Sequence, residues 1–340
     1  MPESVDIKTI LVTGGAGFIG SNFIRYILET RPEWQVVNLD KLTYASNPEA
    51  LEMFNTSSRY TFAKGDIADR EFLEDLFDHY RFDAVVHFAA ESHVDNSISA
   101  PAAFIQTNLV GTFTLLETCR RHWLNDQVAG GGRFLHISTD EVYGSLGESG
   151  KFNEESPYRP NSPYSASKAG SDHLARSYFH TYGMDVVITN CSNNYGPYQH
   201  AEKFIPTIIR KALSGQEIPV YGDGTNVRDW LYVEDHCEAL LVCLEKAAAG
   251  EQYVIGGNNE WANLDLVRYI CKRLDKLAPR ADGAPYYNQM RLVTDRLGHD
   301  RRYAVDAGKL HSQLGWAPRT GFQEGMDRTI TWYLQKFKKA

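Results

Sequence analysis

A glycine-rich segment near the amino terminus constrains the fold of this chain more than any other feature. Gly14, Gly17 and Gly20 lie between a β-branched apolar run at 9–13 and a run of helical character at 21–28. The first glycine allows a tight turn, the second lets backbone approach a pyrophosphate, and the third lets the helix pack closely on the strand. The helix amino terminus offers N–H donors to the same anion. The segment therefore predicts a dinucleotide site, with a purely structural glycine turn as the alternative.

An acidic residue stands where a dinucleotide site requires one. A second predicted strand, 35–39, ends in Asp40, about twenty residues beyond Gly20. A carboxylate at this spacing accepts hydrogen bonds from the ribose hydroxyls of NAD and repels the 2′-phosphate of NADP. Lys41 weakens that preference somewhat. The predicted cofactor is NAD.

Strand and helix patterns continue to alternate as far as residue 195. Further strands are expected at 60–66, 83–90, 133–137 and 185–189, and helices at 69–80, 101–123, 163–183 and, near the carboxyl terminus, 321–339. Right-handed crossovers between such units give an α/β fold with a Rossmann-type, doubly wound parallel sheet. Beyond residue 195 the alternation loosens. We therefore predict an NAD-binding domain at 1–195 that carries the catalytic residues, and a smaller, mixed α/β substrate domain at 196–340, with segments that can interleave.

Composition excludes several other classes of protein. The chain has 340 residues, 43% of them hydrophobic, and a net charge of −8 without any basic run, so nothing favours nucleic acid or anionic lipid. The five cysteines form no Cys-x-x-Cys pair, which favours reduced thiols in a cytoplasmic protein. We expect no signal peptide and no transmembrane helix. We expect no metal site, because His93 has no partner at ligand spacing.

A hydroxyl and two carboxylates follow the predicted strand at 133–137. Thr139, Asp140 and Glu141 stand at its carboxyl end, where open α/β sheets bind ligands. Adjacent strand residues point to opposite faces, so both carboxylates can reach one substrate only if the chain leaves strand geometry here. Gly144 permits such a departure.

A tyrosine and a lysine share one face of the helix that is expected after Pro163. Tyr164 and Lys168 are four residues apart. A nearby ammonium favours the phenolate, so the pKa of Tyr164 is expected to fall, which would make it a general base. An ordinary surface pair is the alternative, because this spacing is common by chance.

The glycine loop, the Tyr164–Lys168 pair and the chain length together resemble the extended short-chain dehydrogenase/reductase family. Within it, four stretches resemble the dTDP-glucose 4,6-dehydratases, and they lie at 40–45, 89–95, 139–144 and 226–233. The Asp-Glu pair after Thr139 is the discriminating feature, since related 4-epimerases usually lack it. Asn96 and Leu297 depart from the dehydratase pattern, which usually has arginine and proline there.

This resemblance implies a lyase that converts dTDP-glucose to dTDP-4-keto-6-deoxyglucose and water by internal hydride transfer through NAD. It implies that Tyr164, supported by Lys168, takes the C4 hydroxyl proton while Thr139 donates to the sugar oxygen at C4. It implies that Glu141 removes the C5 proton and that Asp140 protonates the departing C6 hydroxyl. These roles require the pKa values of the two carboxyl groups to differ.

The resemblance also assigns ligand contacts and an assembly. The expected NAD contacts, which include the three glycines of the loop, are Gly14, Gly17, Phe18, Ile19, Gly20, Asp40, Lys41, Leu42, Thr43, Asp66, Ile67, Phe88, Ala89, Ala90, Thr107, Tyr164, Lys168 and Asn194. The sugar-nucleotide contacts are Ser92, Thr139, Asn193, Lys203, Phe204, Pro219, Val220, Tyr221, Arg228, Asn263, Arg296 and His299. Tyr221 would stack on the base, and Arg228 and Arg296 would hold the diphosphate. The family is commonly a homodimer joined through helices near 101–123 and 163–183.

Two alternatives remain open. One is a 4-epimerase or a 4,6-dehydratase for another sugar nucleotide, and the other is a non-catalytic NAD-binding regulator. The regulator is disfavoured because a sensor needs none of the Thr139, Asp140, Glu141, Tyr164 and Lys168 side chains.

Overall fold

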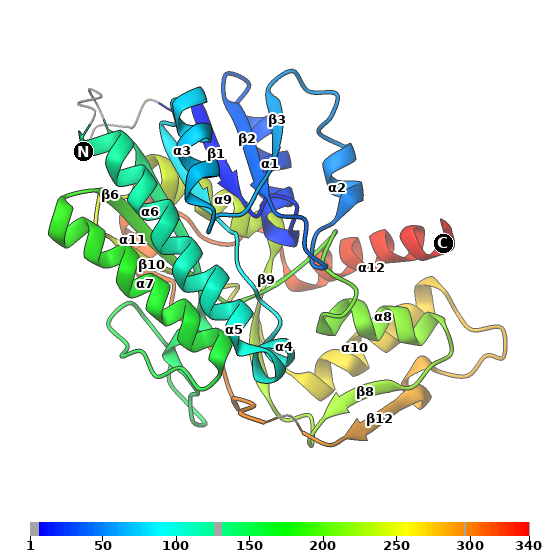
Figure 1. The fold of residues 1–340 in the computed structure, drawn as a ribbon. Helices are drawn as coiled ribbons and strands as arrows, with labels where there is room; N and C mark the ends of the chain where they lie inside the picture. Colours follow the sequence, from blue (N-terminus) through cyan, green and yellow to red (C-terminus); the bar gives the residue numbers. More distant parts are fainter. Residues whose placement is uncertain (1–6, 126–130, 296, 340) are drawn as a thin grey trace.

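The computed structural model describes residues 7–125, 131–295 and 297–339, and its core is a parallel sheet in the order β10-β6-β5-β4-β1-β2-β3 (Figure 1). Its strands are β1 (Thr9–Thr13), β2 (Gln35–Asp40), β3 (Tyr60–Lys64), β4 (Ala84–His87), β5 (Arg133–Thr139), β6 (Asp185–Cys191) and β10 (Gln252–Ile255). Every neighbouring pair in this sheet is parallel. The predicted fold class is confirmed.

Helices cover both faces of the sheet because its strands are apolar on both sides. One face packs against α1 (Phe18–Thr30), α9 (Val233–Lys246) and α11 (Gly308–Leu314). The other face packs against α3 (Arg70–His79), α6 (Thr112–Arg120) and α7 (Pro163–Tyr182). Figure 1 shows α6 and α7 running side by side across this second face.

Local capping signals set the ends of two predicted helices. The Asp69 carboxylate accepts from the Phe72 N–H at 3.1 Å and so caps α3, as its position before the apolar stripe predicts. Ser162 caps α7 in a reciprocal capping box with Ser165, Pro163 occupies the first turn, and Gly183 ends the helix with φ +69°. These caps fix the start of the helix that carries Tyr164.

The helix expected at 101–123 is interrupted by wider turns. The chain runs through α5 (Pro101–Phe104), a π-helical segment η1 (Ile105–Gly111), α6 and a second π-helical segment η2 (Arg121–Asn125). In η1, the Asn108 side chain donates to the Glu91 carbonyl at 3.0 Å and to the Ser167 hydroxyl at 2.9 Å. The π-helical turn therefore ties this helix to α7 and to the loop after β4.

The carboxyl-terminal half builds a second layer with its own apolar core. Its strands form a three-stranded sheet, β11-β9-β7, and a two-stranded sheet, β12-β8. The strands are β7 (Asn193–Tyr195), β8 (Ile218–Tyr221), β9 (Val227–Tyr232), β11 (Glu260–Ala262) and β12 (Met290–Val293), and the helices packed with them are α8 (Phe204–Leu213), α10 (Asn263–Leu277) and α12 (Phe322–Lys339). The remaining short helices are α2 (Pro48–Glu52), α4 (Val94–Ser99), and the 3₁₀ turns η3 (Asp140–Tyr143) and η4 (Tyr286–Gln289).

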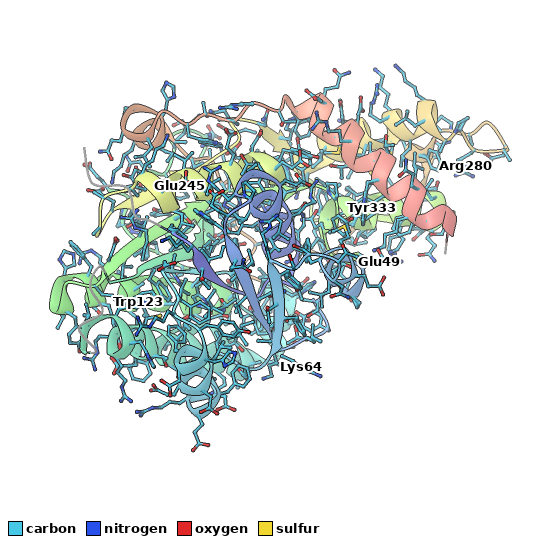
Figure 2. The ribbon with its side chains drawn as sticks, turned by 90° about the horizontal axis from the view of Figure 1, so that it is seen from above. Glu49, Lys64, Trp123, Glu245, Arg280 and Tyr333 are labelled. Atoms are coloured by element: carbon cyan, nitrogen blue, oxygen red, sulfur yellow. The ribbon has the colours of Figure 1, made fainter. Side chains whose placement is uncertain are left out.

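The two halves of the chain interleave. Both β10 and α9 come from beyond residue 195 and complete the large sheet and one of its covering layers. From the carboxyl terminus, α12 reaches α2, where Lys336 pairs with Glu49 at 3.1 Å; Figure 2 labels Glu49 and the buried Tyr333 of α12. The domain boundary near residue 195 stays a prediction. Within the described ranges, no helix combines the length and the apolar character needed to cross a bilayer.

Candidate active site

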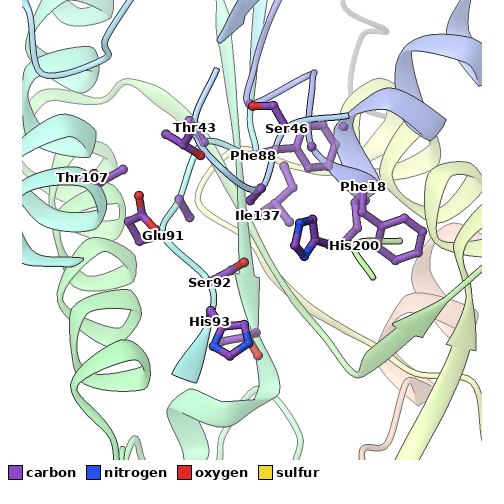
Figure 3. A pocket seen from close by; sticks show the side chains of 18 of the residues that line it. Phe18, Thr43, Ser46, Phe88, Glu91, Ser92, His93, Thr107, Ile137 and His200 are labelled. Atoms are coloured by element: carbon purple, nitrogen blue, oxygen red, sulfur yellow. The ribbon is translucent and has the colours of Figure 1, made fainter. Parts of the chain in front are cut away.

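A cavity of about 310 Å³ lies at the carboxyl edge of the large sheet (Figure 3). All but one of the predicted NAD contacts line it, and these are Gly14, Gly17, Phe18, Ile19, Gly20, Asp40, Lys41, Thr43, Asp66, Ile67, Phe88, Ala89, Ala90, Thr107, Tyr164, Lys168 and Asn194. The exception is Leu42, which is absent from the wall, although its N–H donates to Asp40 at 2.8 Å. Parallel strands bring these scattered residues together because their carboxyl ends share one edge.

The glycine loop leaves room for a ligand against the backbone. Gly14 has φ +71°, and a Cβ there would lie 2.6 Å from the Ala89 nitrogen, so a side chain is excluded. A Cβ on Gly20 would lie 2.4 Å from the Gly14 carbonyl oxygen. A Cβ on Gly17 would meet only the Gly14 carbonyl oxygen, at 3.2 Å. Gly17 is also the N-cap residue of α1, so the N-cap position has no side chain to occupy the first N–H groups of the helix. The start of α1 is thus a cradle open to the cavity that suits a pyrophosphate.

Asp40 is held in place by backbone donors. Its carboxylate accepts from the Ala16 N–H at 2.9 Å and from the Leu42 N–H at 2.8 Å. Burial raises the pKa of Asp40, and these hydrogen bonds oppose the shift. Beside it, Lys41 pairs with Asp66 at 2.6 Å, so the lysine charge is partly neutralised where the ribose site is expected.

The chain leaves strand geometry at Asp140, as the sequence requires. Strand β5 ends at Thr139, whose hydroxyl accepts from the Glu141 N–H at 3.3 Å and so caps η3. The turn ends at Gly144, which has φ +84° and ψ −150°, a conformation that is essentially restricted to glycine. Thr139 and Glu141 line the cavity, whereas Asp140 lies behind its wall.

Asp140 is placed so that it holds a proton. It is 1% exposed, it accepts from the Thr139 hydroxyl at 3.4 Å, and its second oxygen is buried without a hydrogen-bond partner in the described part of the chain. Burial, and then the negative charges of Glu141 and Asp229, raise the pKa of Asp140 well above its ordinary value. The environment of Asp140 next to the cavity therefore favours its protonated form.

The structure corrects the expected acidity of Tyr164. Burial and the negative charge of Glu141 raise the pKa of Tyr164 well above 10, and a hydrogen bond with Thr139 opposes this only in part. Lys168 lies one turn away on α7, but its ammonium donates to the Ile137 carbonyl at 2.9 Å. The lysine is thus engaged by backbone, and the predicted lowering of the tyrosine pKa is wrong for this arrangement.

Four predicted sugar-nucleotide contacts lie on the same cavity. Ser92, Thr139, Asn193 and Lys203 line it. The Lys203 ammonium donates to the Ser92 carbonyl at 2.9 Å, which joins the start of α8 to the loop after β4. The amide oxygen of Asn193 is buried without a hydrogen-bond partner in the ranges that the structure covers. A polar ligand could satisfy it.

The remaining sugar-nucleotide contacts lie away from this cavity wall. They are Phe204, Pro219, Val220, Tyr221, Arg228, Asn263 and His299, and Arg296 lies outside the described residues. Tyr221 and His299 do meet, edge to face with 6.4 Å between ring centroids. Val220 is fully buried in the carboxyl-terminal core.

Arg228 is buried in a different environment from the one expected of a phosphate clamp. Its guanidinium donates to the carbonyls of Val227 and Asp300, each at 2.8 Å, and lies over the Tyr303 ring at 4.2 Å. Its charge also lowers the pKa of Asp140, although less than burial raises it. Arg228 is therefore close to the acid, while its donors contact backbone oxygens.

Several residues on the cavity wall escaped sequence reasoning. They include Tyr44, Ser46, Glu91, His93, Ser138, Cys191, Ser192, Gln199 and His200. Gln199 and His200 come directly after the Asn-Asn-Tyr-Gly-Pro turn, which was the available signal. No three His, Cys, Asp or Glu side chains gather into a metal-binding group within the ranges that the structure describes.

Comparison with known proteins identifies the family. A family described as GDP-mannose 4,6 dehydratase matches residues 11–329. The chain is 56% identical over 330 residues to dTDP-glucose 4,6-dehydratase of Xanthomonas campestris pv. campestris, with 96% of this chain and 93% of that protein covered. The chain belongs to the dTDP-glucose 4,6-dehydratase family.

Solved structures of related proteins match this fold over nearly the whole chain. The dTDP-glucose 4,6-dehydratase of Streptomyces venezuelae, solved with NAD bound, is 46% identical with a TM-score of 0.89, covering 97% of this chain and 98% of that one. A UDP-glucose 4-epimerase of Thermus thermophilus, in complex with NAD, is 30% identical with a TM-score of 0.83, covering 96% and 99%. The dehydratase and epimerase members thus share one fold, so their activities have to be distinguished by the residues of the active site.

Proposed function

We propose that this chain is an NAD-dependent hydro-lyase that converts dTDP-glucose to dTDP-4-keto-6-deoxyglucose and water. The observation that carries the proposal is the 3₁₀ turn after β5, which sets Asp140, whose pKa is raised by burial, and the cavity-lining Glu141 beside Tyr164. An elimination needs both an acid and a base, whereas a 4-epimerisation needs neither carboxyl group. Identity to the dehydratase relatives, at 46% and 56%, exceeds the 30% to the epimerase.

The glycine cradle and Asp40 fit NAD. The start of α1 would hold the pyrophosphate, Asp40 the adenosine ribose, and Lys168 with Tyr164 the nicotinamide end, since all of these groups line one cavity. When bound, NAD supplies a reversible hydride acceptor, so that the sugar can be oxidised and reduced within one turnover.

The chain's own groups would move the protons. Tyr164 takes the proton of the C4 hydroxyl, and Thr139, which is hydrogen-bonded to it, orients the same oxygen. Glu141 removes the C5 proton, which a 4-keto group acidifies. Asp140 donates its proton to the C6 hydroxyl as that group leaves as water. The 4-keto-6-deoxy product would then require the hydride taken from C4 to return to C6 and a proton to return to C5. Because the pKa of Tyr164 is raised here, its role as a base depends on positive charge close by. Lys168, one turn further along α7 and on the same cavity wall, is the cation proposed to supply it.

The sugar and its nucleotide would extend from this acid/base group toward the carboxyl-terminal half. Ser92, Asn193 and Lys203 would contact the sugar and diphosphate, and Tyr221 would stack on the base. Arg228 and Arg296 remain the proposed diphosphate contacts, and Arg228 would have to bind phosphate from a site where it also donates to the Val227 and Asp300 carbonyls.

One experiment separates the proposed reaction from its alternatives. Purified protein is incubated separately with dTDP-glucose, UDP-glucose and CDP-glucose, and each mixture is analysed for a 4-keto-6-deoxy product by mass spectrometry. We expect loss of water with dTDP-glucose. A product of unchanged mass with inverted C4 would support a 4-epimerase. Turnover of UDP-glucose or CDP-glucose alone would show that the substrate carries a base other than thymine. No reaction at all would contradict the proposal.

We further propose a cytoplasmic homodimer. Support for the dimer comes from exposed apolar side chains on the η1–α6 helix, where Ile105, Val110 and Phe113 are 37–47% exposed. Such a row would be covered by the same helices of a second copy. Support for the compartment comes from the five cysteines, which are all buried free thiols.

A further inference from the structure

A buried carboxylate lies one helical turn beyond Lys168 on α7. Asp172 is 2% exposed. Its Oδ1 accepts from His136 Nε2 at 3.0 Å, and its Oδ2 accepts from the Ser138 hydroxyl at 2.8 Å, the Tyr158 hydroxyl at 2.8 Å and Asn190 Nδ2 at 3.0 Å. Burial raises the pKa of Asp172, but the hydrogen bond from His136 and the charge of Lys168 outweigh it, so the pKa is lowered. Asp172 is therefore a fixed anion.

Lys168 is a buried cation that needs such an anion. It is 4% exposed, and its ammonium donates to the Ile137 carbonyl at 2.9 Å. Burial lowers the pKa of Lys168 below its ordinary value, and the negative charge of Asp172 offsets part of that fall. Without a counter-ion, a buried lysine tends to lose its proton.

The other titratable groups around the pair cannot provide that charge. Facing Lys168 and Asp172 are His87 of β4, His136 of β5, Tyr143 of η3, Tyr158, Tyr164 of α7 and Cys191 of β6. Burial lowers the pKa of both histidines, which are neutral at pH 7. Burial raises the pKa of the three tyrosines, and that of Cys191 to about 12, so these groups keep their protons. Among the groups facing Lys168, Asp172 is the anion.

The same hydrogen-bond network reaches the turn η3. Gln252 Nε2 of β10 lies 3.0 Å from the hydroxyls of Tyr158 and Tyr143 and 2.8 Å from Asn190 Oδ1. Tyr143 is the last residue of η3, the turn that carries Asp140 and Glu141. The Asp172 carboxylate is thus connected through hydrogen bonds to the turn that carries Asp140 and Glu141, and it lies on the same helix as Tyr164 and Lys168.

We propose that Asp172 is a positioning residue whose buried negative charge keeps Lys168 protonated at the cavity wall. This inference deepens the proposed function and rests on it, because a charged Lys168 matters only where Tyr164 acts as a base. Asp172 does not line the cavity and acts through Lys168.

The test measures the titration of the Lys168 amine directly. Purified protein is labelled with trace acetic anhydride over a range of pH, and the acetylated peptide that contains Lys168 is quantified by mass spectrometry. In Asp172→Asn, loss of the charge should lower the midpoint of the Lys168 titration by about one to three pH units.

A matched control separates charge from packing. Tyr158→Phe removes one donor to Asp172 but leaves its charge, so the Lys168 midpoint should stay at the wild-type value even if thermal stability falls. An unchanged midpoint in Asp172→Asn, or an equal shift in Tyr158→Phe, would overturn the proposal. If Asp172→Asn does not fold, Asp172→Glu keeps the charge and should retain a midpoint near wild type, whereas a large fall there would also contradict the proposal. The labelling needs no turnover, so its failure is distinct from failure to dehydrate dTDP-glucose.

Discussion

At the scale of single residues, environment separates two neighbouring carboxyl groups. Asp140 is buried, and one of its oxygens has no hydrogen-bond partner among the described residues, whereas Glu141 lines the cavity. Burial of the first and the charge of the second both favour a proton on Asp140. A pair of carboxyl groups with different environments can divide acid and base roles between them.

Substitutions of the two carboxyl groups and of Tyr164 should block different steps of the reaction. Asp140→Asn and Glu141→Gln should leave oxidation at C4 partly intact but slow the loss of water by about two to four orders of magnitude, because each removes one proton-transfer partner. In single turnovers with dTDP-glucose, both variants should build up the near-ultraviolet absorbance of NADH before any 6-deoxy product appears. Tyr164→Phe should show neither. Wild-type turnover by both carboxyl variants would contradict the acid/base assignment.

The dehydration rate should also fall at high pH. Burial and the negative charge of Glu141 raise the pKa of Asp140 well above its ordinary value. Asp140 therefore keeps its proton to a higher pH than an exposed aspartate, and it stops acting as an acid once the pH rises through that raised pKa. A pH profile of single-turnover water loss should therefore show an alkaline decline. That decline should be absent from the residual activity of Asp140→Asn, which has no such group to titrate.

Asp40 should set the choice of cofactor. Its carboxylate is held by the Ala16 and Leu42 N–H groups at the predicted ribose site, where a 2′-phosphate would meet negative charge. We expect NAD to bind at least about tenfold more tightly than NADP in calorimetric titrations. Asp40→Asn should reduce this difference between the two affinities. Equal affinities in the wild-type protein would remove this role from Asp40.

At the scale of elements, the turn η3 depends on one glycine. A Cβ on Gly144 would lie 2.3 Å from the Arg159 carbonyl oxygen, and its φ of +84° is strained for any other residue. Gly144→Ala should lower the free energy of unfolding by more than about 3 kcal/mol and reduce dehydration sharply. Gly183→Ala is the matched control, because Gly183 also has positive φ but faces open space, and it should cost only about 1–2 kcal/mol. Similar activity losses in both would argue against a special role for η3.

Arg228 on strand β9 can act as a structural donor to backbone carbonyls or as a diphosphate contact, and one substitution distinguishes these two roles. Arg228→Ala leaves the carbonyls of Val227 and Asp300 without their donor, so a purely structural role predicts a loss of about 1–3 kcal/mol in unfolding free energy. A diphosphate contact predicts instead that KM for dTDP-glucose rises roughly tenfold or more, with NAD affinity unchanged. Exposed Arg301 on the adjoining segment is the control. An unchanged KM would remove Arg228 from the diphosphate site.

At the scale of the whole molecule, the uncovered helix face should hold two copies together. Phe113 on α6 is 47% exposed, and Leu292 on β12 is 58% exposed at a distant edge. Phe113→Asp should shift the protein from dimer to monomer in sedimentation velocity, because a carboxylate would be buried in the interface. Leu292→Asp should leave the dimer intact. A wild-type protein that sediments as a monomer would contradict the proposed assembly.

Local rules let the sequence predict much of this molecule. Strand β1 and the glycine loop follow from a β-branched run and from positions that admit no side chain, and Asp69 caps α3 as its spacing predicts. The break at Asp140 also follows, because neighbouring strand residues cannot otherwise share one site. Each of these depends on residues close together in the chain.

Only the tertiary structure decided what depends on distant contacts. Burial and the charge of Glu141 raise the pKa of Tyr164, where helix spacing alone predicts a fall. Arg228 donates to backbone at Asp300, and β10 joins the large sheet next to β6, because packing brings together segments that lie far apart in sequence. The spacing of residues therefore determined which chemical groups this protein carries, while desolvation and long-range contacts decided their charge states and partners.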